Sequence, residues 1–471
     1  MRKLTIFFVC VFLLLFPTNV NAFISINSPS AILMDQGTGY ILFAYNEHER
    51  KYPAGLTKML TAIIALDYLN PDDFVVVGNE VNSVSAGALR SGHQVGEHIT
   101  VRNLLRGLMI QNGNDSGVVV ALQTVRAQRN NNAVPFHAAE ELFAAKMNER
   151  ARELGAYNTN FVNPNGLHHE DHYTTAYDLA IIARAFMEHP LLREIAGEVE
   201  FIGNSMDGFT GDIPYGARTV DHHWRDTNEL VSGGGFHYFY ATGIRSGYTP
   251  QASACLAASA SSNGVNLIAV ILNTQDPDRW QDARILFEYG FATYAYRDVI
   301  EAREFLKTVP VYNAKLGTEF TVDIVAKEGF TALFSQAQLA RLERSLYFYE
   351  PYYELLEDGS YILHHASVAV EDIEGDYILQ APVAVGDIVG TIKYRLDGQI
   401  LFEGPAMSAG AVYARTLDSD MDYYIALIMD RVFSVQALPF WLGLAGLFIG
   451  IAGISLAIAE RRRSRRGMYR R

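Results

Sequence analysis

Cysteine is nearly absent from this chain of 471 residues, which has only two. Cys10 lies in an apolar N-terminal segment that has the features of a removable leader, so Cys255 is left alone in the rest of the chain. A single cysteine cannot form an intrachain disulfide. Because Cys255 stands in a run of small apolar residues, we interpret it as a buried small hydrophobe.

Basic residues are also in the minority, with 38 Lys and Arg against 52 Asp and Glu, and the formal net charge is −14. Nine of these 38 cations stand at the two ends, as Arg2 and Lys3 and as the seven arginines of residues 460–471. The part between these ends is therefore more acidic than the whole chain. An acidic surface repels a phosphate backbone, so nucleic acid is excluded as a partner.

A spacing typical of metal sites, such as H-E-x-x-H, is missing as well. His168, His169 and His172 lie close together, and His222 directly precedes His223, but neither group has the spacing of a zinc motif. We therefore interpret all five as loop histidines. We expect neither a metal nor another cofactor.

Two long apolar runs lie near the ends of the chain. Residues 1–22 have the pattern of a secretory signal, with two cations, the apolar run 4–16 and small residues at the exit. Residues 437–459 carry no charge over a length that spans a bilayer, and the basic tail 460–471 follows. Because basic segments stay in the cytoplasm, we predict a single-pass membrane protein with extracytoplasmic domains and a cytoplasmic C-terminus.

The segment from Lys51 to Tyr68 organises the first half of the chain. Its apolar residues recur at the i, i+3, i+4 spacing of a buried helix: Leu56, Met59, Leu60, Ile63 and Ile64. Position 55 and Lys58 are one turn apart, so they share a face at the positive end of that helix. A serine at position 55 would complete S-x-x-K, the nucleophile and lysine of penicillin-interacting acyltransferases. This chain has Gly55 there.

The surrounding sequence resembles a known family. Before the helix, residues 31–34 and 40–44 of SAILMDQGTGYILFAYNEHERKYPAGLTKMLTAIIAL predict a hairpin. This stretch is similar to the opening of the serine-type D-Ala-D-Ala carboxypeptidases, the low-molecular-mass penicillin-binding proteins of bacteria. Further segments match the family in the same order along the chain. Residues 112–114 stand at its S-x-N motif and residues 245–247 at its K-T-G motif. Between them lie two longer matching segments, KMNERARELGAYNTNFVNPNGLHHEDHYTTAYDLAIIARAFMEHP and TVDHHWRDTNELV, the second with Asp226 in place of an Asn.

The resemblance implies a mechanism for a chain with intact motifs. The serine attacks the carbonyl between the two terminal D-alanines of a peptidoglycan stem peptide, or a β-lactam, and the lysine takes its proton. The S-x-N serine returns a proton to the leaving D-alanine, and the K-T-G strand holds the substrate backbone and its carboxylate. The oxyanion hole is implied at the backbone N–H groups of Gly55 and Tyr248.

The departures from the family motifs fall on the groups that move protons or make bonds. Gly55 has no atom that can attack, and Asn112 places an amide where the family has a hydroxyl. Arg245 keeps the positive charge of the motif lysine and suits a carboxylate, and Ser246 keeps a hydroxyl. Three positions are unchanged: Lys58, Asn114 and Gly247. Because loss of a nucleophile costs roughly a millionfold in rate in comparable hydrolases, we expect hydrolysis to be lost.

Three functional hypotheses remain on the sequence alone. The favoured one is a pseudoenzyme of cell-wall metabolism that binds stem peptides or a partner without cleaving them. The rival is a working carboxypeptidase with a rearranged nucleophile, for which Thr57 is a candidate, although its position points off the face of Lys58. The third is a scaffold, which predicts a filled cleft and Arg245 paired internally.

The resemblance implies a penicillin-binding or β-lactamase-like α/β (α+β) domain at residues 23–300, with a central antiparallel sheet flanked by helices. Strands are expected over residues 253–260 and 265–272, with residues 243–246 paired beside them. Thr175 followed by Asp178 predicts a capped helix start.

Residues 301–415 show short alternating apolar segments and predict a small all-β domain, with a helical excursion over residues 330–346. A juxtamembrane connector is expected over residues 416–436.

Overall fold

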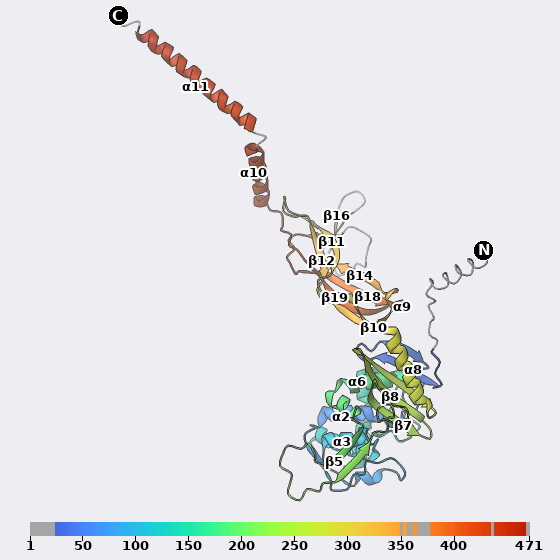
Figure 1. Cartoon of the computed structure of the whole chain (residues 1–471). Coiled ribbons are helices and arrows are strands. Elements are labelled where there is room, and N and C mark those ends of the chain that lie inside the picture. The colour runs from blue at the N-terminus through green and yellow to red at the C-terminus, as the bar shows by residue number, and fades with distance from the viewer. Residues whose placement is uncertain (1–23, 349–351, 356–360, 365–376, 435–437, 468–471) are drawn as a thin grey trace, which may run out of the picture. The chain divides into compact units, whose positions relative to one another are not determined.

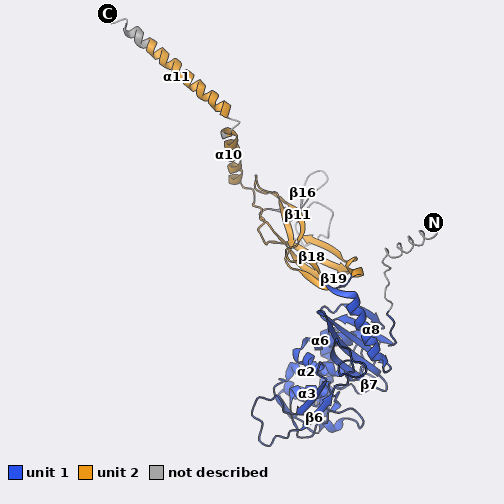
Figure 2. Cartoon of the chain, viewed as in Figure 1, with its two compact units in different colours: residues 1–296, 333–335 blue, residues 297–332, 336–471 orange. Residues whose placement is uncertain are grey.

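The computed structural model describes residues 24–348, 352–355, 361–364, 377–434 and 438–467. The signal peptide expected over residues 1–22 lies outside them. The chain divides into two compact units, residues 1–296 with 333–335 and residues 297–332 with 336–471 (Figure 2).

The first unit is built on a five-stranded antiparallel sheet in the order β2-β1-β9-β8-β7. Its strands are β1 (Ser30–Asp35), β2 (Ile41–Tyr45), β7 (Ala241–Thr249), β8 (Ser253–Ser262) and β9 (Val265–Thr274). The predicted hairpin is confirmed as β1 and β2, and the three strands expected near the K-T-G position are confirmed as β7, β8 and β9. Among the described residues, β7 has a partner strand on one side only, so it forms an edge of this sheet.

Helices cover both faces of the sheet. They are α2 (Lys58–Tyr68), α3 (Val101–Met109), α4 (Asn114–Arg129), α5 (Phe136–Leu154), α6 (Ala176–Glu188), α7 (Pro190–Ala196) and α8 (Asp278–Thr293). Alternate residues of β1 enter two cores: Ile32 and Met34 face the core that contains α2, whereas Ala31 and Leu33 face the core that contains α8. Helix α8 packs on β8 and β9 (Figure 1). The predicted sheet flanked by helices is therefore confirmed.

Shorter elements connect these layers. They are η1 (Ala54–Thr57), η2 (Asn79–Ser83), β3 (Phe74–Val76), β4 (His98–Thr100), β5 (Glu200–Asn204) and β6 (Asp221–Arg225), where η marks a 3-10 helix. Strand β3 pairs with β4, and β5 pairs with β6. The capped start of α6 is confirmed, because the Thr175 side chain accepts a hydrogen bond from the Asp178 backbone N–H.

The second unit contains an eight-stranded sheet in the order β14-β18-β19-β12-β11-β17-β15-β16. Its strands are β11 (Phe305–Tyr312), β12 (Thr321–Ala326), β14 (Glu343–Phe348), β15 (Tyr352–Leu355), β16 (Tyr361–His364), β17 (Tyr377–Gln380), β18 (Ile388–Leu396) and β19 (Gln399–Ser408). This arrangement confirms the expected sheet-rich C-terminal domain. Strand β10 (Tyr294–Ile300) connects the chain to it.

The helical excursion expected over residues 330–346 is wrong. This segment forms β13 (Phe330–Ser335), the four-residue α9 (Gln336–Leu339) and the start of β14. Strand β14 pairs with β18 along six residues, so pairing with a distant strand overrides the local helix propensity of the sequence.

Two helices follow the sheet. Helix α10 (Leu417–Phe433) lies in the segment expected as a connector, and a capping box at Thr416 and Ser419 fixes its start. Helix α11 (Leu438–Gly467) contains a stretch, Leu438–Arg461, that is long and apolar enough to cross a membrane (Figure 1).

Candidate active site

Gly55 lies in the 3-10 turn η1, directly before the helix that begins with Lys58. The turn packs closely against strand β7. A side chain on Gly247 would place its Cβ 2.7 Å from the Gly55 nitrogen, so only glycine at position 247 allows this approach. The packing of β7 against the turn therefore brings the S-x-x-K and K-T-G positions side by side.

A cleft with a cavity volume of about 420 Å³ opens at this junction. Five of the predicted site residues line it: Gly55, Lys58, Asn112, Asn114 and Tyr248. The other lining residues are Gly87, Ala88, Leu89, Asn165, Gly166, Leu167, Thr249 and Pro250. The remaining predicted site residues, Arg245, Ser246 and Gly247, stand on β7 and are buried.

Lys58 is held in a fixed position within the site. Its Nζ donates to Asn114 Oδ1 at 3.0 Å and to the backbone oxygen of Asn165 at 2.6 Å. Burial, reinforced by the charge of Arg245, lowers the pKa of Lys58 well below its usual range, and Asp115 opposes the shift. A lowered pKa favours the neutral amine, which is the form that can accept a proton.

Asn112 takes the place that a side chain at position 55 would need. A Cβ on Gly55 would lie 2.8 Å from Asn112 Oδ1, 3.2 Å from its Nδ2 and 3.3 Å from the backbone oxygen of Ser246. The Asn112 backbone is left-handed, with φ of 62°, a conformation that asparagine tolerates better than most residues. Its Oδ1 is buried and has no hydrogen-bond partner among the described residues. The glycine and the asparagine therefore fit each other sterically.

Arg245 is fully buried on β7, and none of its three guanidinium nitrogens has a hydrogen-bond partner in the described part of the chain. Burial lowers the pKa of Arg245 to about 10, although the Asp226 carboxylate acts in the opposite direction. Burial also raises the pKa of Asp226 to about 7, against the effect of the Arg245 charge. Near neutral pH the guanidinium is therefore charged, and Asp226 neutralises it only in part.

This arrangement matches neither of two earlier expectations for Arg245. Arg245 does not line the cleft, as a guanidinium that binds a ligand carboxylate directly would. The scaffold hypothesis predicts an internal partner for Arg245, but its guanidinium has no hydrogen-bond partner among the described residues. Its charge lies close enough to Lys58 to lower the pKa of that amine. Arg245 thus acts on the cleft by its field from behind the wall that β7 forms.

The hydroxyl of Ser246 is already engaged. It donates to the backbone oxygen of Thr227 at 3.0 Å and lies 2.9 Å from the Thr227 hydroxyl. Strand β7 is thereby fastened to the segment that contains Asp226.

Thr57, the candidate for a rearranged nucleophile, faces away from the cleft toward His172. Its hydroxyl donates to the Ala54 oxygen at 2.9 Å and lies 2.9 Å from His172 Nε2. Because His172 Nδ1 accepts from the Val162 N–H, the proton of the neutral ring is on Nε2, which donates to Thr57. Burial lowers the pKa of His172 to about 3, so the ring stays neutral. His172 therefore cannot take a proton from Thr57 at this nitrogen.

Two contacts that support the site could not be identified from the sequence. The backbone oxygen of Asn165 accepts from Lys58, and that of Leu89 accepts from both the N–H and the side chain of Asn114. Both acceptors are main-chain carbonyls on loops, so no side-chain pattern could have identified them. For Asp226, the sequence shows only a departure from the family motif.

The interpretation of five loop histidines holds for residues 168, 169 and 172 and is wrong for the other two. His222 and His223 stand on β6, whose residues alternate between exposed and buried. His222 is therefore buried while its neighbour His223 is exposed. The alternation in DHHWR was the signal that could have revealed this strand.

Comparison with known proteins places these features in context. The sequence matches the family described as D-alanyl-D-alanine carboxypeptidase over residues 17–276. It is 26% identical over 383 residues to the D-alanyl-D-alanine carboxypeptidase DacF of Bacillus subtilis, covering 80% of this chain and 83% of the relative. It is 31% identical over 264 residues to a D-alanyl-D-alanine carboxypeptidase of a Streptomyces species, covering 55% of this chain and 85% of the relative.

Solved structures agree with the fold. Penicillin-binding protein 5 of Haemophilus influenzae matches 83% of this chain and 98% of its own, with a TM-score of 0.57 and 24% identity. The DD-transpeptidase of Streptomyces K15 matches 57% of this chain and 98% of its own, with a TM-score of 0.50 and 30% identity.

Proposed function

The chain belongs to the D-alanyl-D-alanine carboxypeptidase family, and from this premise we propose that it binds peptidoglycan stem peptides without cleaving them. The relatives are named for action on the D-alanyl-D-alanine terminus, so this terminus is the expected ligand. The proposal separates binding from bond cleavage, because the two depend on different residues of the cleft.

The observation that carries the proposal is the fit between Gly55 and Asn112. No atom at position 55 can attack a carbonyl, and the Asn112 amide takes the space of the missing side chain. Lys58 is positioned as a base but has no hydroxyl on residue 55 to deprotonate. Two motif positions have changed in a sterically complementary way, which supports a site specialised for binding over one that lost a single residue by accident.

Strand β7 supplies the binding surface in this proposal. It is an edge strand beside the cleft, and an extended peptide can add to such an edge through main-chain hydrogen bonds. Tyr248 and Thr249 of β7 line the cleft. The charge of Arg245 behind the strand attracts the terminal carboxylate of the peptide, which carries the opposite charge. β-Lactams are expected to bind in the same cleft without forming a covalent bond.

The cell location follows from the same premise. The apolar stretch of α11 supports a single-pass anchor, and the basic tail after residue 460 favours a cytoplasmic C-terminus. Both folded units would then face the cell wall, where stem peptides are found.

The test uses the full-length chain purified from membranes in detergent. Calorimetry measures binding of a pentapeptide that ends in D-Ala-D-Ala, and the same peptide with a C-terminal amide serves as the control. Release of D-Ala and intact mass after incubation with a penicillin are measured in parallel. We expect saturable binding of the free acid, at least about tenfold weaker binding of the amide, no released D-Ala and no mass adduct.

Two results would overturn the proposal. Absence of binding would favour the scaffold hypothesis. A penicillin adduct or released D-Ala would favour a working carboxypeptidase. Among the described residues that line the cleft, only Tyr248 and Thr249 carry a hydroxyl. Peptide mapping of the adduct in the Tyr248→Phe and Thr249→Val variants would then identify the attacking residue.

A further inference from the structure

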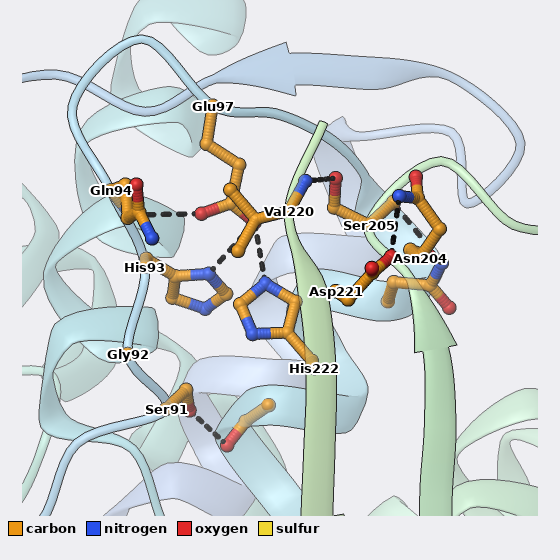
Figure 3. Close-up of polar contacts among 12 residues, drawn as sticks. Ser91, Gly92, His93, Gln94, Glu97, Asn204, Ser205, Val220, Asp221 and His222 are labelled. Carbon is orange, nitrogen blue, oxygen red and sulfur yellow. Dashed lines mark hydrogen bonds and ion pairs between the residues drawn. The ribbon is translucent and has the colours of Figure 1, made fainter. Parts of the chain in front are cut away.

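A second buried polar cluster lies outside the cleft, formed by His93, Glu97 and His222 (Figure 3). His93 and Glu97 lie on the loop before β4, and His222 stands on β6, 125 residues after Glu97. Glu97 Oε1 lies 3.3 Å from His93 Nδ1 and 2.7 Å from His222 Nε2. The side chains of His93 and Glu97 are 0% exposed, and that of His222 is 3% exposed.

The hydrogen bonds around His93 indicate which of its nitrogens carries a proton. His93 Nε2 lies 2.9 Å from Ser116 Oγ, Ser116 Oγ lies 2.8 Å from Ser91 Oγ, and Ser91 Oγ donates to the Gly107 oxygen at 2.8 Å. These three hydrogen bonds need three protons, but the hydroxyls of Ser91 and Ser116 supply only two. The third proton is therefore on His93 Nε2, which donates to Ser116 Oγ.

The other ring nitrogen, Nδ1, faces the Glu97 carboxylate across 3.3 Å. A cation placed between these two atoms would be bound by both of them. His222 Nε2 adjoins the same carboxylate oxygen, and the three candidate donor atoms all lie within 4.8 Å of one another. Ligand atoms bound to one tetrahedral ion at about 2.0–2.2 Å stand roughly 3.3–3.6 Å apart, so small side-chain shifts would accommodate an ion.

We propose that His93, Glu97 and His222 form a binding site for one divalent transition-metal ion of the zinc class. Two imidazoles and one carboxylate are ligands that Zn²⁺ prefers, whereas Ca²⁺ and Mg²⁺ require a shell of oxygen atoms. A water molecule would complete a tetrahedral shell around the ion.

The surroundings of the cluster resemble the outer shell of a metal site. The backbone N–H of Gln94 donates to Glu97 Oε2 at 2.8 Å, and Ser116 holds the far nitrogen of His93. The ring of His222 stacks on Trp224 with 4.5 Å between ring centroids. These contacts fix the orientation of each proposed ligand.

The ion would act on the cleft through the loop that carries His93. The loop residues 87–89 form part of the cleft wall, and Leu89 bonds to Asn114 at the start of α4. His93, Glu97 and His222 do not themselves line the cleft, so the role of the ion is structural. It would tie the loop to β6 and hold that wall in place.

The experiment uses the full-length chain purified without a polyhistidine tag, stripped with a chelator and titrated with Zn²⁺. Metal content by mass spectrometry should show one ion per chain, and Zn²⁺ should raise the melting temperature. Co²⁺ in place of zinc should give the absorption bands of a tetrahedral site. The His222→Gln variant should bind at least about tenfold more weakly.

The neighbour His223 provides a matched control. It stands on the same strand, but its side chain is 64% exposed and pairs with Glu200. The His223→Gln variant should keep the affinity and the Co²⁺ spectrum of the unchanged chain. His93→Gln should reproduce the loss, with circular dichroism reporting whether each variant folds.

Three outcomes would overturn the proposal. The first is no bound metal at micromolar Zn²⁺. The second is equal binding by the unchanged chain and a folded His222→Gln variant, and the third is loss of binding in His223→Gln. None of these readouts depends on peptide binding, so failure here is distinguishable from failure of the proposed function.

Discussion

The cleft and the histidine cluster are two buried polar regions that meet at the start of helix α4. Asn114 faces the cleft, whereas Ser116, two residues later, contacts His93 in the cluster. At the cleft, Asn112 Oδ1 has no hydrogen-bond partner among the described residues, and neither do the guanidinium nitrogens of Arg245 behind the β7 wall. In the cluster, every polar side chain named above has one.

This difference separates the cleft, where buried polar groups are left open for a peptide, from the cluster, whose contacts and proposed structural ion hold the fold. A buried polar group without a partner costs free energy, and such groups collect at functional sites. A closed network contributes to stability and restricts the chain to one arrangement. Changes in the cleft should therefore alter binding and chemistry, while changes in the network beside it should mainly alter stability.

The largest expected effect is the return of acylation in the Gly55→Ser/Asn112→Ser double variant. The second change removes the amide that would crowd the new serine, whose Cβ would lie 2.8 Å from Asn112 Oδ1. With Lys58 in place as the base, the rate of penicillin adduct formation should rise by several orders of magnitude. Intact-mass spectrometry over time measures this rate.

The matched control is Gly55→Ala/Asn112→Ser, which has the same bulk at position 55 but no nucleophile and should form no adduct. Gly55→Ser alone should react more slowly than the double variant. Equal rates for the two serine variants would contradict the steric role given to Asn112.

The next effect is a loss of stability in the Asp115→Ala variant. The Asp115 carboxylate accepts from the backbone N–H groups of Ser91, Gly92 and His93, so it fastens the loop to α4. Removing it leaves these buried donors unpaired and should lower the free energy of unfolding by about 3–5 kcal/mol. Urea unfolding measures the change, and Asp115→Asn, which keeps one acceptor oxygen, should lose less. An Asp115→Ala variant as stable as the unchanged chain would contradict the difference proposed between the cleft and the network beside it.

Arg245→Met should have opposite effects on stability and binding. Methionine fills a similar volume without a buried charge, so the free energy of unfolding should rise by about 1–3 kcal/mol. Affinity for the D-Ala-D-Ala pentapeptide should fall at least about tenfold, because the attracting charge is gone. Thermal unfolding and calorimetry on the same preparation test both statements. A destabilised variant would show that Arg245 is structural.

The smallest expected effect is a pH dependence of peptide binding. The raised pKa of Asp226, about 7, means that its negative charge appears only as the pH rises through that value. Below pH 7 the neutral carboxyl no longer offsets the charge of Arg245, so affinity for the peptide carboxylate should be a few-fold higher at pH 6 than at pH 8.

The Asp226→Asn variant, neutral at every pH, should bind with the higher affinity throughout and show a flatter profile. The same shift predicts that Asp226 lowers the stability of the fold as the pH rises from about 4 to about 7, since the folded state holds its proton longer. Identical pH profiles for the two proteins would show that Asp226 does not cause the pH dependence of peptide binding.

Much of the fold could be predicted because its signals are local. The hairpin β1–β2 follows from alternation around a Gly-Thr-Gly turn, and the apolar stretch of α11 from its length and lack of charge. The strands of the second unit were expected, but β13 and β14 were not, because residues 330–346 read locally as helix. Their pairing depends on strands distant in the sequence, which a local window does not include.

The candidate site also has features that the local sequence predicts and features that it does not. The sequence by itself determined that position 55 lacks a nucleophile and that a lysine stands one turn later, since both facts are properties of single residues at a fixed helical spacing.

Only the tertiary structure decided that the Asn112 amide occupies the space beside Gly55 and that His222 meets His93 and Glu97. It also decided that Arg245 is buried without a hydrogen-bond partner among the described residues. These outcomes depend on the packing of β7 against η1 and on the packing of β6 against a loop more than 100 residues away. Side-chain contacts of this kind are set by how distant elements pack, and no spacing along the chain encodes them.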